Sequence, residues 1–273
     1  MYDLYQEAST PWEWQGELKA YAEEIGMELF SSPFDYQAVD FLESIGVKKY
    51  KIASPEAMDY PLISYAAKFK KPMFISTGMV SLKEIQGAID ACYAVGNKDV
   101  TLLKCTSEYP APLEHMNLVT ISDMISRFGA RGVKVGLSDH SMNIEPVVAA
   151  VALGATMIEK HFTLDRALGG TDCGFSLNTE EFRAMVQAVR NTEKALGKVN
   201  YISNGVRKRG ARSLFVVKDI KAGEKFTSEN VRSIRPSNGL HPKYYHQVLG
   251  KTASKNIKFG SPLLFEHIKE ELK

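Results

Sequence analysis

The chain has 273 residues, of which 44% are hydrophobic, and a formal net charge of +2 at pH 7. This length is sufficient to bury a large core and to form more than one domain. No apolar run approaches the roughly 18 residues of a membrane span and no leader pattern is evident, so we expect neither membrane association nor secretion. Cys92, Cys105 and Cys173 show no CxxC spacing, which favours reduced thiols in a cytoplasmic protein.

The charge is distributed unevenly along the chain. From Lys198 onward, 16 Lys and Arg stand against 6 Asp and Glu, a balance of +10 that leaves −8 for the remainder. A basic domain can indicate nucleic-acid binding, but these residues alternate with turn signals and form no basic helix. We therefore expect no nucleic-acid partner, and we interpret the basic part as docking on an acidic body or holding an anionic substrate.

Six strand-like runs occur in the first two thirds of the chain, and each ends in small or polar residues: MELFSSP, KYKIASP, PMFISTG, VTLLKCTS, VKVGLSDHS and TMIEKHFT. Helical patterns separate them, as in SLKEIQGAIDACYAVG, where apolar residues recur at helical spacing. Alternating strands and helices predict parallel βαβ units with right-handed crossovers. Polar residues at the carboxyl ends of strands are typical of the active face of an α/β barrel, so we predict a TIM-type (β/α) barrel.

The pattern changes after a predicted helix from about Thr179 to Leu196, for which Gly197 is a suitable C-cap. A polar stretch follows, and from Arg212 onward short strands alternate with tight turns such as KAGE and KFGS. We therefore predict an α/β barrel over residues 1–197, a linker over 198–211 and a small, mostly β domain over 212–273.

Two histidines follow two successive predicted strands, His140 after KVGLSD and His161 after TMIEK. Neighbouring strands of a barrel lie about 4.8 Å apart and functional groups gather at their carboxyl ends, so the two imidazoles are expected to converge. Glu159 shares a strand face with His161, whereas Lys160 points the other way. This arrangement predicts a metal site at the mouth of the barrel. For either histidine alone, a strand cap or a satisfied core group is the alternative.

Several segments together resemble the sialic acid synthase family, most closely its pseudaminic acid synthase branch: LYQEASTPWEW, SSPFD, YKIASPE, STGM, KCTSEYPAP, GLSDHS, IEKHFTLDR, GGTDCGFSL and SIRPSNGLHPKYY. The resemblance implies a phosphoenolpyruvate-condensing barrel joined to a C-terminal antifreeze-like (SAF) domain. It also implies that the family's first two barrel strands should precede Met1. We therefore expect an N-terminally incomplete barrel with six of eight strands.

The implied reaction joins phosphoenolpyruvate to an N-acetylated amino sugar and yields a nine-carbon 2-keto acid plus phosphate. The segments FSL and GLHPKYY favour the pseudaminate branch, whose sugar is a 2,4-diacetamido-2,4,6-trideoxy hexose. N-acetylneuraminate or legionaminate synthesis is the alternative within the family. An alternative of another class is a truncated, inactive remnant that acts only as a binding or dimerisation module.

The resemblance also implies roles for individual residues. A divalent ion between His140 and His161 would polarise the sugar aldehyde. Two imidazoles suit Mn, Co or Zn, and a water-rich shell also accepts Mg; by resemblance we favour Mn or Mg, with Co as an alternative. Glu56 or Glu159 would orient or deprotonate the attacking water, and Glu159 has the alternative role of orienting a metal-bound histidine.

The remaining implied residues bind the two substrates. The family's anion-contacting positions correspond to Lys51, Ser54, Ser76 and Ser107, and its sugar-hydroxyl positions to Tyr109 and Asp172. Arg235 corresponds to an arginine that reaches the active site of the partner subunit. The resemblance therefore implies a homodimer in which each SAF domain covers the other subunit's barrel.

Overall fold

The computed structural model describes residues 9–201 and 210–272, and the chain forms two compact units, Met1–Gly197 and Lys198–Lys273. Residues 202–209 of the predicted linker and residues 4–8 of the motif LYQEASTPWEW lie outside the described residues. No helix in the described ranges combines the length and hydropathy needed to cross a membrane.

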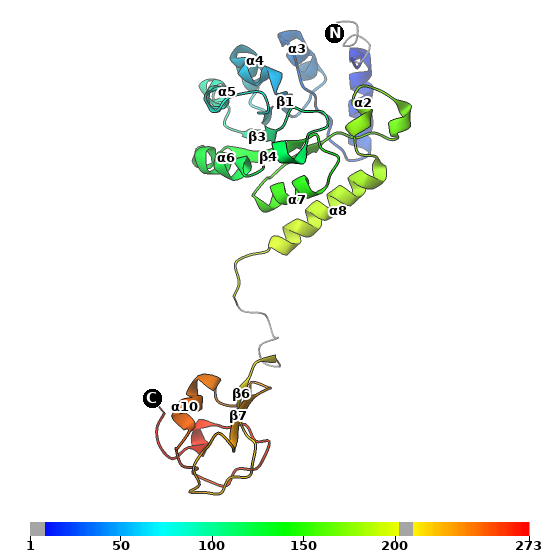
Figure 1. Cartoon of the computed structure of the whole chain (residues 1–273). Coiled ribbons are helices and arrows are strands. Elements are labelled where there is room, and N and C mark those ends of the chain that lie inside the picture. The colour runs from blue at the N-terminus through cyan, green and yellow to red at the C-terminus, as the bar shows by residue number, and fades with distance from the viewer. Residues whose placement is uncertain (1–8, 202–209, 273) are drawn as a thin grey trace. The chain divides into compact units, whose positions relative to one another are not determined.

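The first unit is built on a parallel sheet with the strand order β1-β2-β3-β4-β5 (Figure 1). Its strands are short and follow one another along the chain: Tyr50–Ile52, Met73–Ser76, Val100–Cys105, Lys134–Asp139 and Ile158–Lys160. One α-helix connects each pair of neighbouring strands: α4 Tyr60–Ala67, α5 Leu82–Ala94, α6 Thr120–Phe128 and α7 Glu145–Ala152. This βαβ alternation confirms the predicted TIM-type arrangement.

The sheet has five strands in the described residues, not the six that the sequence predicted. The first predicted strand, residues 27–33, has no strand assignment. One backbone hydrogen bond ties it to β1, from the Lys51 N–H to the Ser31 carbonyl at 3.3 Å. Because a strand is defined by a repeated ladder of such bonds, a single one leaves the segment merely extended beside β1.

Helices pack on the outer face of the sheet, and the apolar core lies between them (Figure 1). The sheet contributes alternate residues to this core, which are Tyr50, Ile52, Met73, Ile75, Val100, Leu102, Val135 and Leu137. Local signals fix where the helices begin: Ser81 and Glu84 form a capping box at α5, and Asn178 and Glu181 form another at α8 (Thr179–Leu196). The bounds of α8 confirm the predicted helix.

Further helices and turns complete the first unit. Two helices precede the sheet, α2 Trp12–Glu24 and α3 Tyr36–Ser44. Single 3-10 turns occupy the loops: η1 Pro55–Met58, η2 Leu113–His115, η3 Gly129–Arg131, η4 Arg166–Leu168 and η5 Cys173–Phe175.

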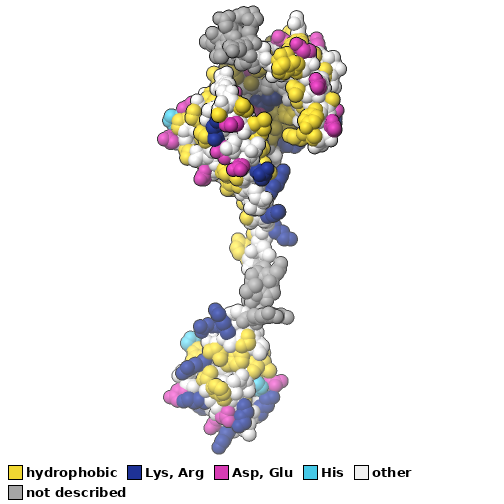
Figure 2. Space-filling model, turned by 90° about the vertical axis from the view of Figure 1, so that its right-hand side faces the viewer, with side chains coloured by type: hydrophobic (Ala, Val, Ile, Leu, Met, Phe, Trp, Pro, Cys, Tyr) yellow, Lys and Arg dark blue, Asp and Glu magenta, His cyan; other side chains and the backbone are white. Residues whose placement is uncertain are grey.

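The second unit has a core of its own around an antiparallel pair, β6 Ser213–Val216 and β7 Val231–Ile234. The unit also contains isolated bridges and three short segments, η6 Pro242–Tyr244, α10 Tyr245–Val248 and η7 Phe265–His267. Gly223 and Gly260 in the predicted turns have φ angles of 88° and 82°, which favour glycine. On the face visible in Figure 2, the described Lys and Arg side chains of this unit are scattered and form no continuous stripe.

Candidate active site

The two histidines lie at neighbouring strand ends, as predicted. His140 follows β4 directly and His161 follows β5 directly. Their ring centroids are 5.1 Å apart and their planes are inclined by 67°. Parallel pairing of β4 with β5 brings both carboxyl ends to the same edge of the sheet, which is why residues 21 positions apart in sequence meet.

Hydrogen bonding indicates which nitrogen of each ring is available to a ligand. His140 Nδ1 lies 2.9 Å from the Thr106 carbonyl oxygen, which can only accept, so Nδ1 carries the proton. His161 Nδ1 lies 3.4 Å from Asp172 Oδ2, which favours the same tautomer. In both neutral rings the Nε2 lone pair is then free. Histidines held by a carbonyl or carboxylate in this way are typical metal ligands.

Their surroundings shift the pKa values of the two imidazoles in opposite directions. Burial acts to lower the pKa of His140, but hydrogen bonds to the Cys105 thiol and the Thr106 carbonyl outweigh burial and raise it. Burial and the neighbouring His140 together lower the pKa of His161. His161 is therefore the more readily neutral ring, and a neutral imidazole is the form that binds a metal.

The distance between the rings fits two ligands of one ion. Metal–nitrogen bonds of about 2.1 Å place two ring centroids about 4.5 to 5.2 Å apart when they approach the ion at angles between right and tetrahedral. No cluster of three or more His, Cys, Asp or Glu suited to a metal occurs in the described part of the chain. The protein thus offers two imidazoles, and oxygen atoms of water or substrate would complete the shell.

A carboxylate and an ammonium meet on the inner face of the sheet, away from the helices. Ser138 Oγ donates to Glu159 Oε1 at 2.8 Å, and Lys51 Nζ lies 3.4 Å from Glu159 Oε2. Lys51 belongs to β1 and Glu159 to β5, so this ion pair joins the first and last strands across the concave side of the sheet. Lys51 is buried, and a buried ammonium requires a negative partner.

The three predicted anion-contacting serines lie in or just after neighbouring strands. Ser76 is the last residue of β2, and its buried Oγ has no hydrogen-bond partner among the described residues. Ser54 lies beyond β1 and accepts a hydrogen bond from the Gly78 N–H at 3.0 Å. Ser107 lies beyond β3, and a Cβ on Gly78 would come within 2.3 Å of its Oγ. Glycine at position 78 therefore allows these loops to approach one another.

Glu56 lies on η1, just after β1. Its Oε2 is buried and has no hydrogen-bond partner within residues 9–201 and 210–272, and burial raises the pKa of the carboxyl. The side chain lines a cavity of about 760 Å³, together with Ser31 and Ser32 of the extended segment. A carboxyl of this kind can hold a proton closer to neutral pH than a solvated one.

Two of the three predicted sugar-binding residues lie beside the histidine pair. The Tyr109 ring is tilted by 50° against His140 at a centroid distance of 4.4 Å and lies 5.4 Å from the Phe175 ring. Asp172 is half exposed beside His161. Arg235 follows β7 and belongs to the second unit.

Sequence reasoning missed Ser138 and Cys105, which both lie among the site residues. Cys105 Sγ lies 3.9 Å from His140 Nδ1 and 3.6 Å from Ser107 Oγ. Burial acts to raise the thiol pKa, but hydrogen bonds to His140, Ser54 and Ser107 outweigh it and lower the pKa to about 7. Strand register could have identified both residues, because Cys105 pairs with Ser138 and Ser138 pairs with Glu159 on the same face of the sheet.

Comparison with known proteins places these residues in a defined family. Residues 1–201 match the NeuB family and residues 211–269 match the SAF domain. The chain is 44% identical to pseudaminic acid synthase of Helicobacter pylori, covering 100% of this chain and 80% of that protein. It is 47% identical to pseudaminic acid synthase of Campylobacter jejuni, covering 96% and 77%.

Solved structures agree with this assignment. The spore coat polysaccharide biosynthesis protein SpsE of Bacillus subtilis aligns with a TM-score of 0.67 at 31% identity, covering 99% of this chain and 81% of that one. The N-acetylneuraminic acid synthetase of Leptospira borgpetersenii aligns with a TM-score of 0.70 at 31% identity, covering 74% and 70%. The chain belongs to the NeuB family and carries a C-terminal SAF domain.

Proposed function

We propose that the chain condenses phosphoenolpyruvate with a 2,4-diacetamido-2,4,6-trideoxy hexose to give a nine-carbon 2-keto sugar acid and phosphate. The observation that carries the proposal is the pair of neighbouring rings His140 and His161 at the ends of β4 and β5, with Glu159 close enough to act electrostatically on both rings and paired with Lys51 on the inner face. Relatives named pseudaminic acid synthase, at 44% and 47% identity over nearly the whole chain, support this choice of sugar.

The chemistry requires two successive bond-forming steps. The enol carbon of phosphoenolpyruvate attacks the aldehyde carbon of the open-chain sugar, whose oxygen takes up a proton. The cationic centre left at C2 is attacked by water, which loses a proton. The bond between C2 and the phosphate oxygen then breaks while the remaining hydroxyl proton on C2 passes to the departing phosphate, giving the ketone and inorganic phosphate. The site must therefore hold two anionic groups, orient an aldehyde and move a proton from water.

His140 and His161 supply the ligands for a divalent ion, with Mn or Mg favoured. When bound, such an ion supplies Lewis-acid polarisation of the aldehyde oxygen. The free Nε2 atoms support this role, because both Nδ1 atoms face oxygen acceptors.

Two carboxyl groups can move the proton. Glu159 lies on the inner face of β5, two residues before His161 and on the same side of the chain. Its charge suits stabilisation of the cationic C2 centre. Glu56 has the raised pKa of a buried carboxyl, which suits proton exchange with the attacking water. The two groups differ in environment, since Glu159 faces an ammonium and Glu56 has an unpaired oxygen.

The phosphate and carboxylate of phosphoenolpyruvate need cationic and hydroxyl partners. Lys51 is the buried cation of the inner face, and Ser54, Ser76 and Ser107 contribute hydroxyls near the strand ends. The Ser76 hydroxyl, buried without a partner, is available to an anion.

The sugar is bound by Tyr109 and Asp172, and Arg235 reaches the site of a second copy of the chain in a homodimer. A guanidinium suits an amide carbonyl or another sugar oxygen. We expect Arg235→Ala to raise KM for the sugar and to leave KM for phosphoenolpyruvate unchanged. An unchanged sugar KM would refute this role.

The three free cysteines fit a cytoplasmic location.

Legionaminate or N-acetylneuraminate synthesis is the second candidate, because a Campylobacter jejuni relative named N,N'-diacetyllegionaminic acid synthase is 38% identical over 89% of this chain. Release of phosphate from phosphoenolpyruvate, measured separately with each candidate sugar and with and without Mn²⁺, discriminates the candidates. We expect release with the 2,4-diacetamido-2,4,6-trideoxy hexose. Release with another sugar alone would change the substrate, and release with none would refute synthase activity of this chain.

A further inference from the structure

Lys160 is a buried lysine on the outer face of β5, opposite its neighbours Glu159 and His161. Its side chain is 1% exposed and its Nζ lies 2.5 Å from Asp139 Oδ2, an atom of a carboxylate that is fully buried. Asp139 is the last residue of β4 and is paired in register with Lys160. The ion pair therefore links the two strands at the point where each is followed by a histidine.

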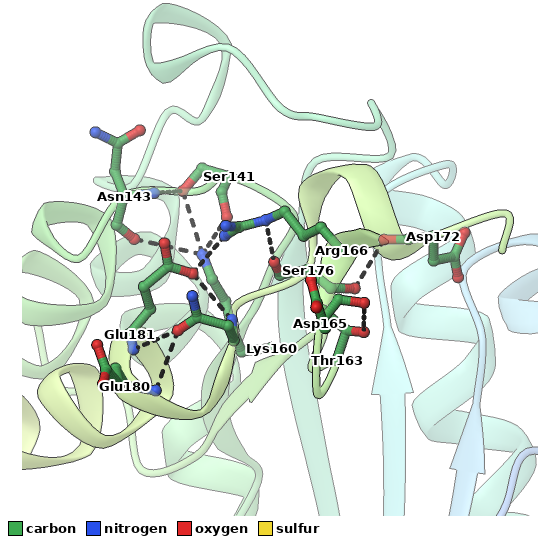
Figure 3. Close-up of polar contacts among 11 residues, drawn as sticks. Ser141, Asn143, Lys160, Thr163, Asp165, Arg166, Asp172, Ser176, Glu180 and Glu181 are labelled. Carbon is green, nitrogen blue, oxygen red and sulfur yellow. Dashed lines mark hydrogen bonds and ion pairs between the residues drawn. The ribbon is translucent and has the colours of Figure 1, made fainter. Parts of the chain in front are cut away.

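The same ammonium also binds the loop that carries His140. Lys160 Nζ donates to the Ser141 carbonyl and lies 3.4 Å from both Ser141 Oγ and the Asn143 carbonyl oxygen. Figure 3 shows the lysine side chain directed toward Ser141 and Asn143. Asp139 Oδ1 also accepts the Ser141 N–H at 2.8 Å. These contacts hold the chain on both sides of His140.

We infer that Lys160 is a positioning residue that sets the distance between His140 and His161 for metal binding. The inference deepens the proposed function and rests on it. Burial of an ammonium is costly, and a well-packed apolar pair often gives equal stability, so stability alone is a weak reason for an ion pair here. The contacts of Lys160 with residues on either side of one imidazole ligand supply a more specific one.

The alternative is a purely structural role, in which loss of Lys160 lowers stability and leaves metal affinity unchanged. Mn²⁺ binding to the purified full chain, followed by the electron paramagnetic resonance signal of free Mn²⁺, separates the two roles without any measurement of turnover. For Lys160→Met, which keeps the aliphatic stem and removes the charge, we expect the Kd for Mn²⁺ to rise about 10- to 100-fold. Raising the Mn²⁺ concentration should restore part of the rate of phosphate release.

Lys160→Met leaves Asp139 buried and unpaired, which can prevent folding. The double variant Asp139→Asn, Lys160→Met removes both charges and avoids this problem. We expect it to fold, as judged by circular dichroism, and to bind Mn²⁺ about 10-fold or more weakly. Lys71→Met is the matched control, because Lys71 lies just before β2, at the opposite end of the strands. Its Nζ lies 2.5 Å from Oε1 of Glu43, a residue of α3. This control should bind Mn²⁺ as the unmodified chain does.

The outcomes distinguish failure of this inference from failure of the proposed function. If the unmodified chain binds Mn²⁺ and the folded double variant binds it equally well, the positioning role is wrong and the metal site stands. If the unmodified chain binds no Mn²⁺, the metal site itself is wrong, and the inference falls with it.

Discussion

The two faces of the five-stranded sheet differ in the side chains that they carry. The outer face contributes fully buried apolar residues, such as Ile75, Leu102 and Leu137, to the core beneath the helices. The inner face carries Lys51, Ser138 and Glu159, whose charges and hydroxyls contact one another. One face therefore determines that the sheet folds, and the other determines what the folded sheet can bind.

Three charged residues interrupt the otherwise apolar outer face. The side chains of Lys104, Asp139 and Lys160 are buried there. Lys104 Nζ donates to Thr106 Oγ1 at 2.6 Å, and the carbonyl of Thr106 accepts from His140. Charged groups on the outer face thus contact residues that adjoin or hydrogen-bond His140, namely Thr106 and Ser141. A polar residue that interrupts an apolar face is informative because its burial must be compensated locally.

The largest effect is expected from removing an imidazole at the edge of the inner face. His161→Ala should lower phosphate release by about 1000-fold or more, because it would remove a proposed ligand of the ion proposed to polarise the aldehyde. Binding of Mn²⁺ should weaken in parallel, and the thermal unfolding midpoint measured without metal should change little, since the ring is not part of the apolar core. Full retention of Mn²⁺ binding in both His161→Ala and His140→Ala would contradict the metal assignment.

A smaller loss of rate is expected from neutralising the inner-face carboxylate. Glu159→Gln should lower kcat by about 100- to 10,000-fold, the range for loss of a general acid or base. Glu43→Gln is the matched control, because Glu43 also pairs with a lysine, Lys71, but lies on α3 away from the inner face. If both variants retain the kcat of the unmodified chain, Glu159 has no part in the chemical steps.

An outer-face residue should affect stability and spare the chemistry. Leu102 lies in the central strand β3 and is 0% exposed. Leu102→Ala should lower the free energy of unfolding by about 2–5 kcal/mol through lost apolar contact and the cavity left behind. Urea unfolding measures this change, and kcat per folded molecule should be unaltered. A fall in kcat without a fall in stability would mean that the two faces are not separable.

Sequence reasoning identified the alternation of strands and helices because each strand supplies a short apolar run and the segments between strands carry apolar residues at helical spacing. Side-chain caps mark some helix starts, such as Ser81 at α5, but α6 and α7 begin without one. It placed His140 and His161 correctly at strand ends, since parallel strands bring their carboxyl ends to one edge. It wrongly assigned a strand to residues 27–33, because a strand depends on a partner ladder and not on local pattern alone.

Side-chain contacts between different strands and loops could not be predicted from the sequence pattern. The pairing of Lys51 with Glu159 joins β1 to β5, and it depends on how strongly the sheet curves. Cys105 was interpreted as an ordinary reduced thiol because sequence gives no distance to His140 or Ser107. The outer-face direction of Lys160 was predicted from alternation, but its contacts with the His140 loop required the loop conformation.

The smallest effect is expected from Glu56, and it concerns the pH dependence of stability. Burial raises the folded-state pKa of this carboxyl above its ordinary value of 4.5. Between the ordinary pKa and the folded-state pKa, Glu56 therefore binds more protons in the folded chain than in the unfolded chain. The contribution of Glu56 to stability is lost as pH rises through the folded-state pKa. Glutamine mimics the neutral acid, so the stability of Glu56→Gln relative to the unmodified chain should improve from about pH 4.5 to about pH 7.

Glu84 provides a control of opposite sign. Hydrogen bonds from Ser81 lower the pKa of this exposed carboxyl at the start of α5, so its contribution is present above the ordinary pKa and is lost as pH falls. Glu84→Gln should therefore lose stability relative to the unmodified chain over the same rise in pH. Urea unfolding of both variants at the two pH values compares these slopes. Equal slopes for Glu56→Gln and Glu84→Gln would show that burial does not hold the proton on Glu56.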